Sequence, residues 1–291
     1  MLQRVSGTQS YREWLPVPPL RREVACVWAQ QVAAAGPAHE HRTVPNGCVE
    51  MSHALGSDVV AVAGAQRRPI VGLLAPGTTV VGVRLRPAAA TSILGWPAAE
   101  LVDLHLGLDE LWGRSATPLA GRLTAKGSPV AAAELLEAEI LRHGTETAAD
   151  PLVDAAVERL QPWQAGDIGA WSANLYISAR QLRRRFVAAL GYGPKTLQRI
   201  LRFQGFLALS QQHRADVGSL ARLAGEAGYA DQPHLTRECV RLAEQTPRAL
   251  LREIRASCSS NHDHDASYSE LGRALLAAWL AGGRRRHGSR A

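Results

Sequence analysis

Two segments in the second half of the chain, 53 residues apart, follow the same pattern of a helix-capping residue, a leucine four positions later and an arginine two positions after that. Residues 178–186 read Ser-Ala-Arg-Gln-Leu-Arg-Arg-Arg-Phe, and residues 231–239 read Asp-Gln-Pro-His-Leu-Thr-Arg-Glu-Cys. Each copy begins with Ser or Asp, whose side-chain oxygen can accept a hydrogen bond from a free backbone N–H at a helix start. A short helix and a tight turn precede each copy, most clearly over 220–228. The repeat therefore predicts two helix-turn-helix units in one chain.

The second helix of each predicted unit carries side chains that can read DNA bases. Arginine can donate two parallel hydrogen bonds to guanine, and glutamine can pair in the same way with adenine. Two such helices can enter successive major grooves about 34 Å apart. We expect the first unit, with Arg180, Arg183, Arg184 and Arg185, to dominate affinity. The predicted DNA-contacting residues are Ser178, Arg180, Gln181, Arg183, Arg184, Lys195, Gln232, His234, Thr236 and Arg237.

The net charge of +7 is unevenly distributed along the 291 residues. Residues 1–150 carry 13 basic and 14 acidic side chains, whereas residues 151–257 carry 15 basic and 9 acidic ones. A neutral first half joined to a basic second half indicates that only the second half contacts a polyanion. Without a run of about 18 apolar residues or an N-terminal leader, we expect neither a membrane span nor a secretory signal. The four irregularly spaced cysteines, Cys26, Cys48, Cys239 and Cys258, are typical of reduced thiols in a cytoplasmic protein.

The first half shows short apolar runs separated by turn residues. Such runs predict strands over 23–29, 48–53, 59–63 and 78–85, with turns at 45–47, 56–57 and 76–77. After Pro87 the apolar spacing becomes helical, over 88–94, 108–112 and 130–142. We therefore expect an α+β fold, in which an antiparallel sheet or small barrel with helices precedes an all-α domain with two helix-turn-helix units.

The second half has helical spacing throughout. The expected helices cover 152–160, 168–174, 179–189, 194–211, 217–227, 232–244 and 247–255. The expected domains are an effector-binding or dimerisation domain over 1–143, a linker over 144–151, and a DNA-binding domain over 152–256. A polar and basic tail over 257–291, with one short helix at 271–280, ends the chain.

Residues 152–254 resemble the double helix-turn-helix domain of the AraC/XylS family of bacterial transcription regulators. In the first unit the matching positions are Ser178, Leu182, Arg184, Phe186, Gly191, Pro194 and Arg202. In the second unit they are Ala224, Gly228, Tyr229, Asp231, His234, Leu235, Arg237, Thr246 and Pro247. The family's base-facing positions fall on Arg180, Arg183 and Arg184, and on Gln232, Pro233, His234 and Arg237. The chain departs from the pattern at Tyr176 and Gln245, where glycine is expected, and at Cys239, where an aromatic residue is expected.

The first half resembles the sensor-type domain that precedes this reader in a subset of the family. The segments that carry the resemblance are 41–48, 80–87, 94–97 and 108–113. In the wider family this domain binds a small effector, dimerises, or both. From the residues themselves, a sheet pocket lined by Trp28 and Met51 is the expected effector site, and the other tryptophans, Trp14, Trp96 and Trp112, are expected in the core.

Other chemistry is less well supported by the residues. His39, His41, Cys48 and His53 follow no known zinc spacing, and we interpret them as surface histidines beside a buried thiol. The pair His262 and His264 is read as part of a polar tail. Cys48 with His41 or His53 lacks the surroundings of a catalytic nucleophile. Glu134, Glu137 and Glu139 fit the solvated face of a helix.

The sequence therefore predicts a sequence-specific transcription regulator that is not an enzyme and that needs no metal or cofactor. Its expected partners are double-stranded DNA, a small-molecule effector, RNA polymerase and a second copy of the chain. The alternative is a ligand-binding or enzymatic first domain that the basic half tethers to nucleic acid. The operator, the effector and the sign of regulation are not encoded in any motif.

Overall fold

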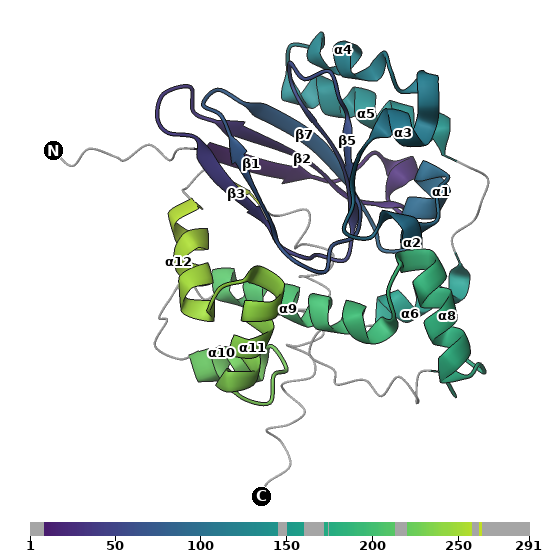
Figure 1. Ribbon diagram of the computed structural model, residues 1–291, viewed down its shortest axis with the longest axis vertical. Helices are drawn as coiled ribbons and strands as arrows, with labels where there is room; N and C mark the ends of the chain where they lie inside the picture. Colours follow the sequence, from purple (N-terminus) through teal and green to yellow (C-terminus); the bar gives the residue numbers. More distant parts are fainter. Residues whose placement is uncertain are drawn as a thin grey trace, which may run out of the picture.

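The computed structural model describes residues 9–144, 150–159, 172–173, 175–212, 220–257 and 262–263. A sheet with flanking helices forms the N-terminal part, and an all-helical C-terminal part lies against it (Figure 1). Some of the predicted features lie outside the described residues: most of the linker, most of the helix at 168–174, Cys258, His264 and the helix at 271–280.

The N-terminal part contains a large and a small antiparallel sheet. The large sheet has the order β8-β5-β4-β7-β2-β1-β9, and only the pairing of β1 with β9 is parallel. The small sheet pairs β3 with β6. The strands are β1 (Gln9–Trp14), β2 (Val24–Val32), β3 (His39–Thr43), β4 (Val49–Ala54), β5 (Ala61–Ala63), β6 (Ile70–Leu74), β7 (Thr79–Leu85), β8 (His105–Gly107) and β9 (His262–Asp263).

The two faces of the large sheet have different chemistry. On β4, Val49, Met51 and His53 are buried, whereas Glu50 and Ser52 alternate with them and lie on the other face. Helix α5 packs along β7 and β2 and covers the apolar face. The helices of this part are α1 (Ala90–Leu94), α2 (Ala98–Leu101), α3 (Leu108–Trp112), α4 (Leu119–Thr124) and α5 (Pro129–His143).

Two of the three glutamates on α5 do not lie on a solvated face. Glu137 and Glu139 are only 3% and 2% exposed, whereas Glu134 is exposed. Glu137 accepts a hydrogen bond from the backbone N–H of Val17 at 2.7 Å. Glu139 accepts from Arg122 and Arg142, each at 2.6 Å. The predicted solvated face is therefore wrong at these two positions, because both carboxylates are buried and accept hydrogen bonds from other parts of the protein or from the next turn of α5.

Between residues 151 and 257 the described regular elements are all helices, as the sequence predicts, whereas His262–Asp263, expected in a polar tail, forms β9 beside β1. The helices of the C-terminal part are α6 (Pro151–Arg159), α8 (Ala179–Leu190), α9 (Pro194–Gln212), α10 (Leu220–Glu226), α11 (Gln232–Ala243) and α12 (Pro247–Ser257). The predicted fold class, an antiparallel sheet domain followed by a helical domain, is confirmed. No helix in the described part of the chain has the length and apolar character that crossing a membrane requires.

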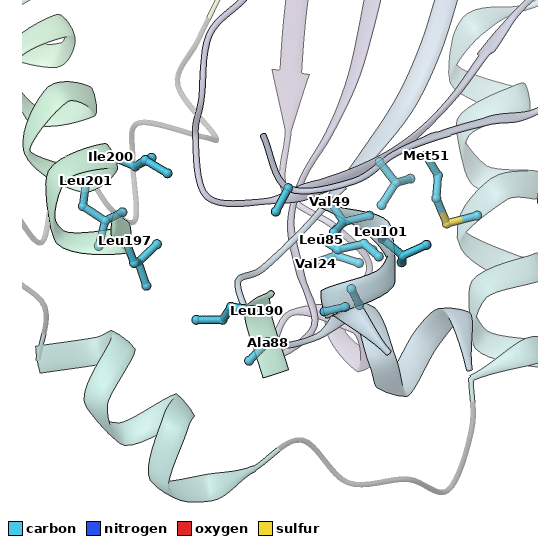
Figure 2. Close-up of a cluster of buried hydrophobic side chains, with 14 of the residues drawn as sticks. Val24, Val49, Met51, Leu85, Ala88, Leu101, Leu190, Leu197, Ile200 and Leu201 are labelled. Carbon is cyan, nitrogen blue, oxygen red and sulfur yellow. The ribbon is translucent and has the colours of Figure 1, made fainter. Parts of the chain in front are cut away.

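The two parts share one apolar core. Leu190, Leu197 and Ile200 from α8 and α9 lie in the same buried cluster as Val49 and Leu85 from the sheet (Figure 2). Gly47 has a left-handed φ of 84°, and a Cβ there would lie 2.9 Å from Leu197. A side chain at position 47 would thus be strained and would collide with α9.

Polar contacts also join the two parts. Arg42 of β3 donates to Glu253 of α12 at 2.9 Å and to the carbonyl of Ala243 at 3.4 Å. Gln204 of α9 donates to the carbonyl of Pro45 at 2.6 Å. The position of the helical part on the sheet domain is therefore fixed by directional contacts as well as by apolar burial.

Candidate nucleic-acid interface

Helix α8 begins at a well-formed N-cap. The Ser178 hydroxyl accepts from the backbone N–H of Gln181 at 3.2 Å, and Gln181 Oε1 accepts from the backbone N–H of Ser178 at 2.8 Å. This reciprocal pair is a capping box, which satisfies two N–H groups that a helix start leaves free. The predicted DNA-contacting role of Ser178 and Gln181 therefore competes with a structural role in the cap.

The faces of α8 separate apolar from basic side chains. Leu182, Phe186 and Leu190 are buried and follow one another four residues apart. Arg180, Arg183 and Arg184 are exposed, and none of the three makes a hydrogen bond or ion pair with another described residue. Lys195, in the first turn of α9, is exposed as well. The first unit thus presents unpaired cations to the solvent.

Arg185 differs from the other three arginines of α8. Its guanidinium donates to Asp150 at 2.7 Å, which attaches the recognition helix to the segment before α6. One of the four arginines of the first unit therefore already has a carboxylate partner, and the expectation that this unit dominates affinity stays a prediction.

Helix α11 resembles α8 in its capped N-terminus and its buried apolar face, but it carries different polar residues on its outer face. Asp231 caps the helix by accepting from the backbone N–H of His234 at 2.6 Å. Leu235, Cys239 and Leu242 are buried, whereas Gln232 and Arg237 are exposed. Two of the predicted readers of this unit are partly engaged. The Thr236 hydroxyl donates to the carbonyl of Gln232 at 3.0 Å, and the His234 ring packs edge-on against Tyr229 with centroids 5.2 Å apart.

Helix α9 holds the two units in one arrangement. Arg199 of α9 donates two hydrogen bonds, at 2.9 and 3.2 Å, to Glu238 on the buried side of α11. Arg202 of α9 stacks over the Tyr229 ring at 5.8 Å. Helix α9 also contacts α8 and α10. Sequence reasoning missed Arg199 and Glu238, although a charged residue at an apolar position of a helix is a signal of such pairing.

A cavity of about 190 Å³ lies in the sheet domain, between the large and the small sheet. Trp28 lines it, and so do Gln30, His41, Glu50, Ser52 and His105. Gln30 Nε2 donates to His41 Nδ1 at 3.2 Å. Burial lowers the pKa of His41, so the ring is neutral near pH 7 and its Nδ1 can accept.

Glu50, at the floor of this cavity, is held by two donors. It accepts from Asn46 at 2.7 Å and from the Arg84 guanidinium at 2.8 Å. Trp28 Nε1 is buried and makes no hydrogen bond to a described residue. The cavity therefore offers polar groups beside apolar ones, without an arginine or lysine among its lining residues.

Three sequence-based expectations about this domain are wrong. Met51 does not line the cavity with Trp28: it lies on the opposite face of β4, fully buried among Val24, Leu85 and Leu101 (Figure 2). His53 is not a surface histidine, because its ring is buried between the Val59 carbonyl at 2.9 Å and the Thr124 hydroxyl at 3.0 Å.

The third wrong expectation concerns Trp96, which is exposed and does not belong to the core. Within the described residues no group of three or more His, Cys, Asp or Glu side chains is arranged to hold a metal ion. The buried thiol predicted at Cys48 is present, and the thiols of Cys26 and Cys239 are buried and free as well.

Two domain families match the chain. Residues 12–107 match a domain of unknown function (DUF6597), and residues 171–253 match a helix-turn-helix domain (HTH_18). The second match covers α8 to α11 with both caps and the connecting α9. No curated protein matches the chain.

Solved structures of ToxT from Vibrio cholerae are similar to the chain. One has a TM-score of 0.41 at 7% identity and covers 85% of this chain and 98% of that chain. Wild-type ToxT with a bound unsaturated fatty acid has a TM-score of 0.39 at 9% identity, over 86% of this chain and 96% of that chain. ToxT bound to (E)-4-(8-methylnaphthalen-1-yl)but-3-enoic acid has a TM-score of 0.42 at 9% identity, over 86% and 99%.

The helix-turn-helix match and the paired caps agree with the residues that carry the resemblance in the sequence. The C-terminal end of the chain therefore carries a helix-turn-helix domain, in the part of the sequence that resembles the AraC/XylS family, and an antiparallel sheet domain precedes it.

Proposed function

We propose that the protein binds specific sequences of double-stranded DNA by placing α8 and α11 in successive major grooves. The observation that carries the proposal is the pair of capped helices, each with an apolar inner face and outward arginines, held by the single helix α9. A rigid connection between two readers favours DNA binding because it fixes the spacing of the half-sites in advance.

The free guanidinium groups give the proposal its electrostatic basis. Arg180, Arg183, Arg184 and Arg237 are exposed, and none has a hydrogen-bonding partner among the described residues. An arginine without a partner can bind a phosphate or a guanine edge without first breaking an ion pair. We therefore expect affinity to decrease as salt increases.

Replacement of Arg184 by Ala tests the role of α8. We expect a loss of about 1–3 kcal/mol in binding free energy on the preferred sequence and a relaxed preference at one base pair. Fluorescence anisotropy measures it, with duplexes selected by the wild-type chain from a random pool and with single-base variants of them.

Arg185→Ala is the matched control, since it removes the same charge from the next position of the same helix, where the guanidinium already binds Asp150. Its effect should be smaller and equal on all sequences. An Arg184→Ala loss that is likewise equal on all sequences would make Arg184 a phosphate contact rather than a base reader.

The cavity between the sheets supports the effector part of the proposal. At about 190 Å³ it is smaller than the ~300–1,000 Å³ of pockets for drug-sized ligands, so it suits a smaller metabolite that combines apolar surface with a few polar groups. Native mass spectrometry of the full chain, incubated with a metabolite extract, would show added mass. Ala63→Phe, which fills the cavity from β5, should remove that mass and retain DNA binding. Equal added mass in both proteins would exclude the cavity.

The burial of Cys48 argues against the alternative function, in which the first domain is catalytic. Burial raises the pKa of Cys48 to about 12, so its thiolate is scarce at neutral pH and the thiol is a poor nucleophile. We infer that the protein is not an enzyme and that it acts in the bacterial cytoplasm. Contacts with RNA polymerase and with a second copy of the chain stay predictions.

A further inference from the structure

The turn before α8 contains a tyrosine in a conformation that favours glycine. Tyr176 has a φ of 54°, in the left-handed region, and its side chain is 97% exposed. Its backbone N–H bonds to the carbonyl of Ala173 at 3.0 Å, and the next N–H, of Ile177, bonds to the carbonyl of Ser172 at 3.0 Å. This pair of bonds is the Schellman pattern that ends a helix.

The second unit makes the same turn with glycine. The N–H of Gly228 bonds to the carbonyl of Gly225 at 3.1 Å, and the N–H of Tyr229 bonds to the carbonyl of Ala224 at 2.8 Å. Gly228 has a φ of 78° and therefore occupies the structural place of Tyr176. The two units thus differ at this position, and only the first carries the steric cost of a side chain in the left-handed region.

No contact within the described chain offsets that cost. The Tyr176 ring is almost completely exposed, and its hydroxyl makes no hydrogen bond to a described residue. The tyrosine lies two residues before the Ser178 cap, where the first recognition helix begins and where Arg180 is also exposed. Helix starts of this kind approach the DNA backbone with their free N–H groups.

We propose that Tyr176 is a DNA-contacting residue of the first unit, with its hydroxyl donating to a backbone phosphate. The proposal rests on the DNA binding proposed above and adds a contact that the repeat does not provide in the second unit. Tyrosine hydroxyls are among the ordinary donors to phosphate oxygens. Because the contact is to the backbone, it contributes affinity on every sequence and no base preference.

Substitution by glycine separates folding from binding at this site. Tyr176→Gly removes the strain, so the melting temperature of the full chain should rise by roughly 2–4 °C. The same change removes the hydroxyl, so DNA affinity should fall about three- to tenfold, equally on a selected duplex and on an unrelated duplex. Tyr176→Phe keeps the ring and the strain, and it should show the loss of affinity without the gain in stability.

Glu244 provides the matched control, since it is an exposed left-handed residue (φ 55°) at the far end of α11. Glu244→Gly should raise the melting temperature similarly, and its DNA affinity should equal that of Glu244→Gln, which removes the same charge. Unchanged affinity in both Tyr176 variants, with wild-type binding intact, would overturn the proposal. A wild-type chain that binds neither duplex would instead refute the proposed function.

Discussion

Gly191 is the position at which one added methyl group should separate the two parts of the protein. It ends α8 in a left-handed conformation with φ 80°, and a Cβ there would lie 2.0 Å from Val102 Cγ2 and 3.0 Å from the carbonyl oxygen of Ala98. Val102 and Ala98 belong to the segment of α2 in the sheet domain. Gly191→Ala therefore strains the end of α8 and pushes that helix away from α2.

The expected cost follows from these two effects. A left-handed alanine costs about 1–2 kcal/mol relative to glycine, and overpacking of a close contact typically costs about 1–3 kcal/mol. Alanine also reduces the conformational entropy of the unfolded chain, which stabilises the folded protein by about 0.4–1 kcal/mol. We expect Gly191→Ala to lower the free energy of unfolding by about 2–4 kcal/mol, a large part of the ~5–15 kcal/mol that holds a typical domain together.

Urea denaturation followed by circular dichroism measures this loss. Gly193→Ala is the control two residues away: its φ is not in the left-handed region, and a Cβ there would meet Arg183 at an ordinary 3.6 Å. This control should change stability by less than about 1 kcal/mol. Adding Val102→Ala to Gly191→Ala should recover part of the loss, as a double-mutant cycle would show. Equal midpoints for the two glycine variants would refute the steric reasoning.

Two further outcomes follow from the contacts of the sheet domain. Arg42→Ala removes the hydrogen bonds that Arg42 donates to Glu253 and to the Ala243 carbonyl and leaves Glu253 with Gln245 as its donor, so the free energy of unfolding should fall by about 1–3 kcal/mol; an unchanged urea midpoint would show that the Arg42 contact does not hold α12. The pKa of His41 is lowered by burial, against the opposing charge of Glu50 and with smaller contributions from His39 and Arg84. The unfolded chain therefore binds a proton near pH 6.5 that the folded chain does not, and stability should be lost as pH falls from 7.5 to 5.5. His41→Gln should reduce this loss of stability, measured as the melting temperature between pH 7.5 and pH 5.5. A variant whose melting temperature depends on pH as in the wild type would contradict the role of His41.

The sequence predicts the helical half well because its signals are local. A cap, a four-residue apolar spacing and a turn residue lie within one helix-turn-helix unit, so α8 and α11 begin where the repeat places them. The strands found in advance, such as β4 and β7, are those with strong apolar runs. These elements need no knowledge of distant partners.

Two of the strands that the sequence analysis missed, β1 and β3, are polar, for a reason that only the folded chain shows. In β1, Glu13 is buried because the hydroxyl of Tyr11 donates to it at 2.6 Å and Arg84 of β7 lies 3.3 Å from it. In β3, His41 and Arg42 face a cavity and a distant helix. A polar strand whose buried side chains have partners far along the chain looks like a loop in the local sequence.

The sequence predicts which charged residues belong to the candidate site, but not which of them are bound to other residues of the protein. The sequence indicates which arginines belong to α8, but not that Arg185 is bound to Asp150 or that Gln181 closes the cap. The departure at Tyr176 is visible in the sequence. Its meaning depends on the turn, which places a strained and exposed ring beside the recognition helix.

The apolar cluster that runs from the sheet into α9 has a practical consequence for anyone who truncates this chain. A fragment that begins at α6 would carry Leu190, Leu197 and Ile200 without the sheet that now covers them (Figure 2). Such newly bared hydrophobic surface promotes self-association. DNA-footprinting experiments with the fragment that begins at α6 would thus be disturbed by aggregation. The full chain is therefore the better protein for such experiments.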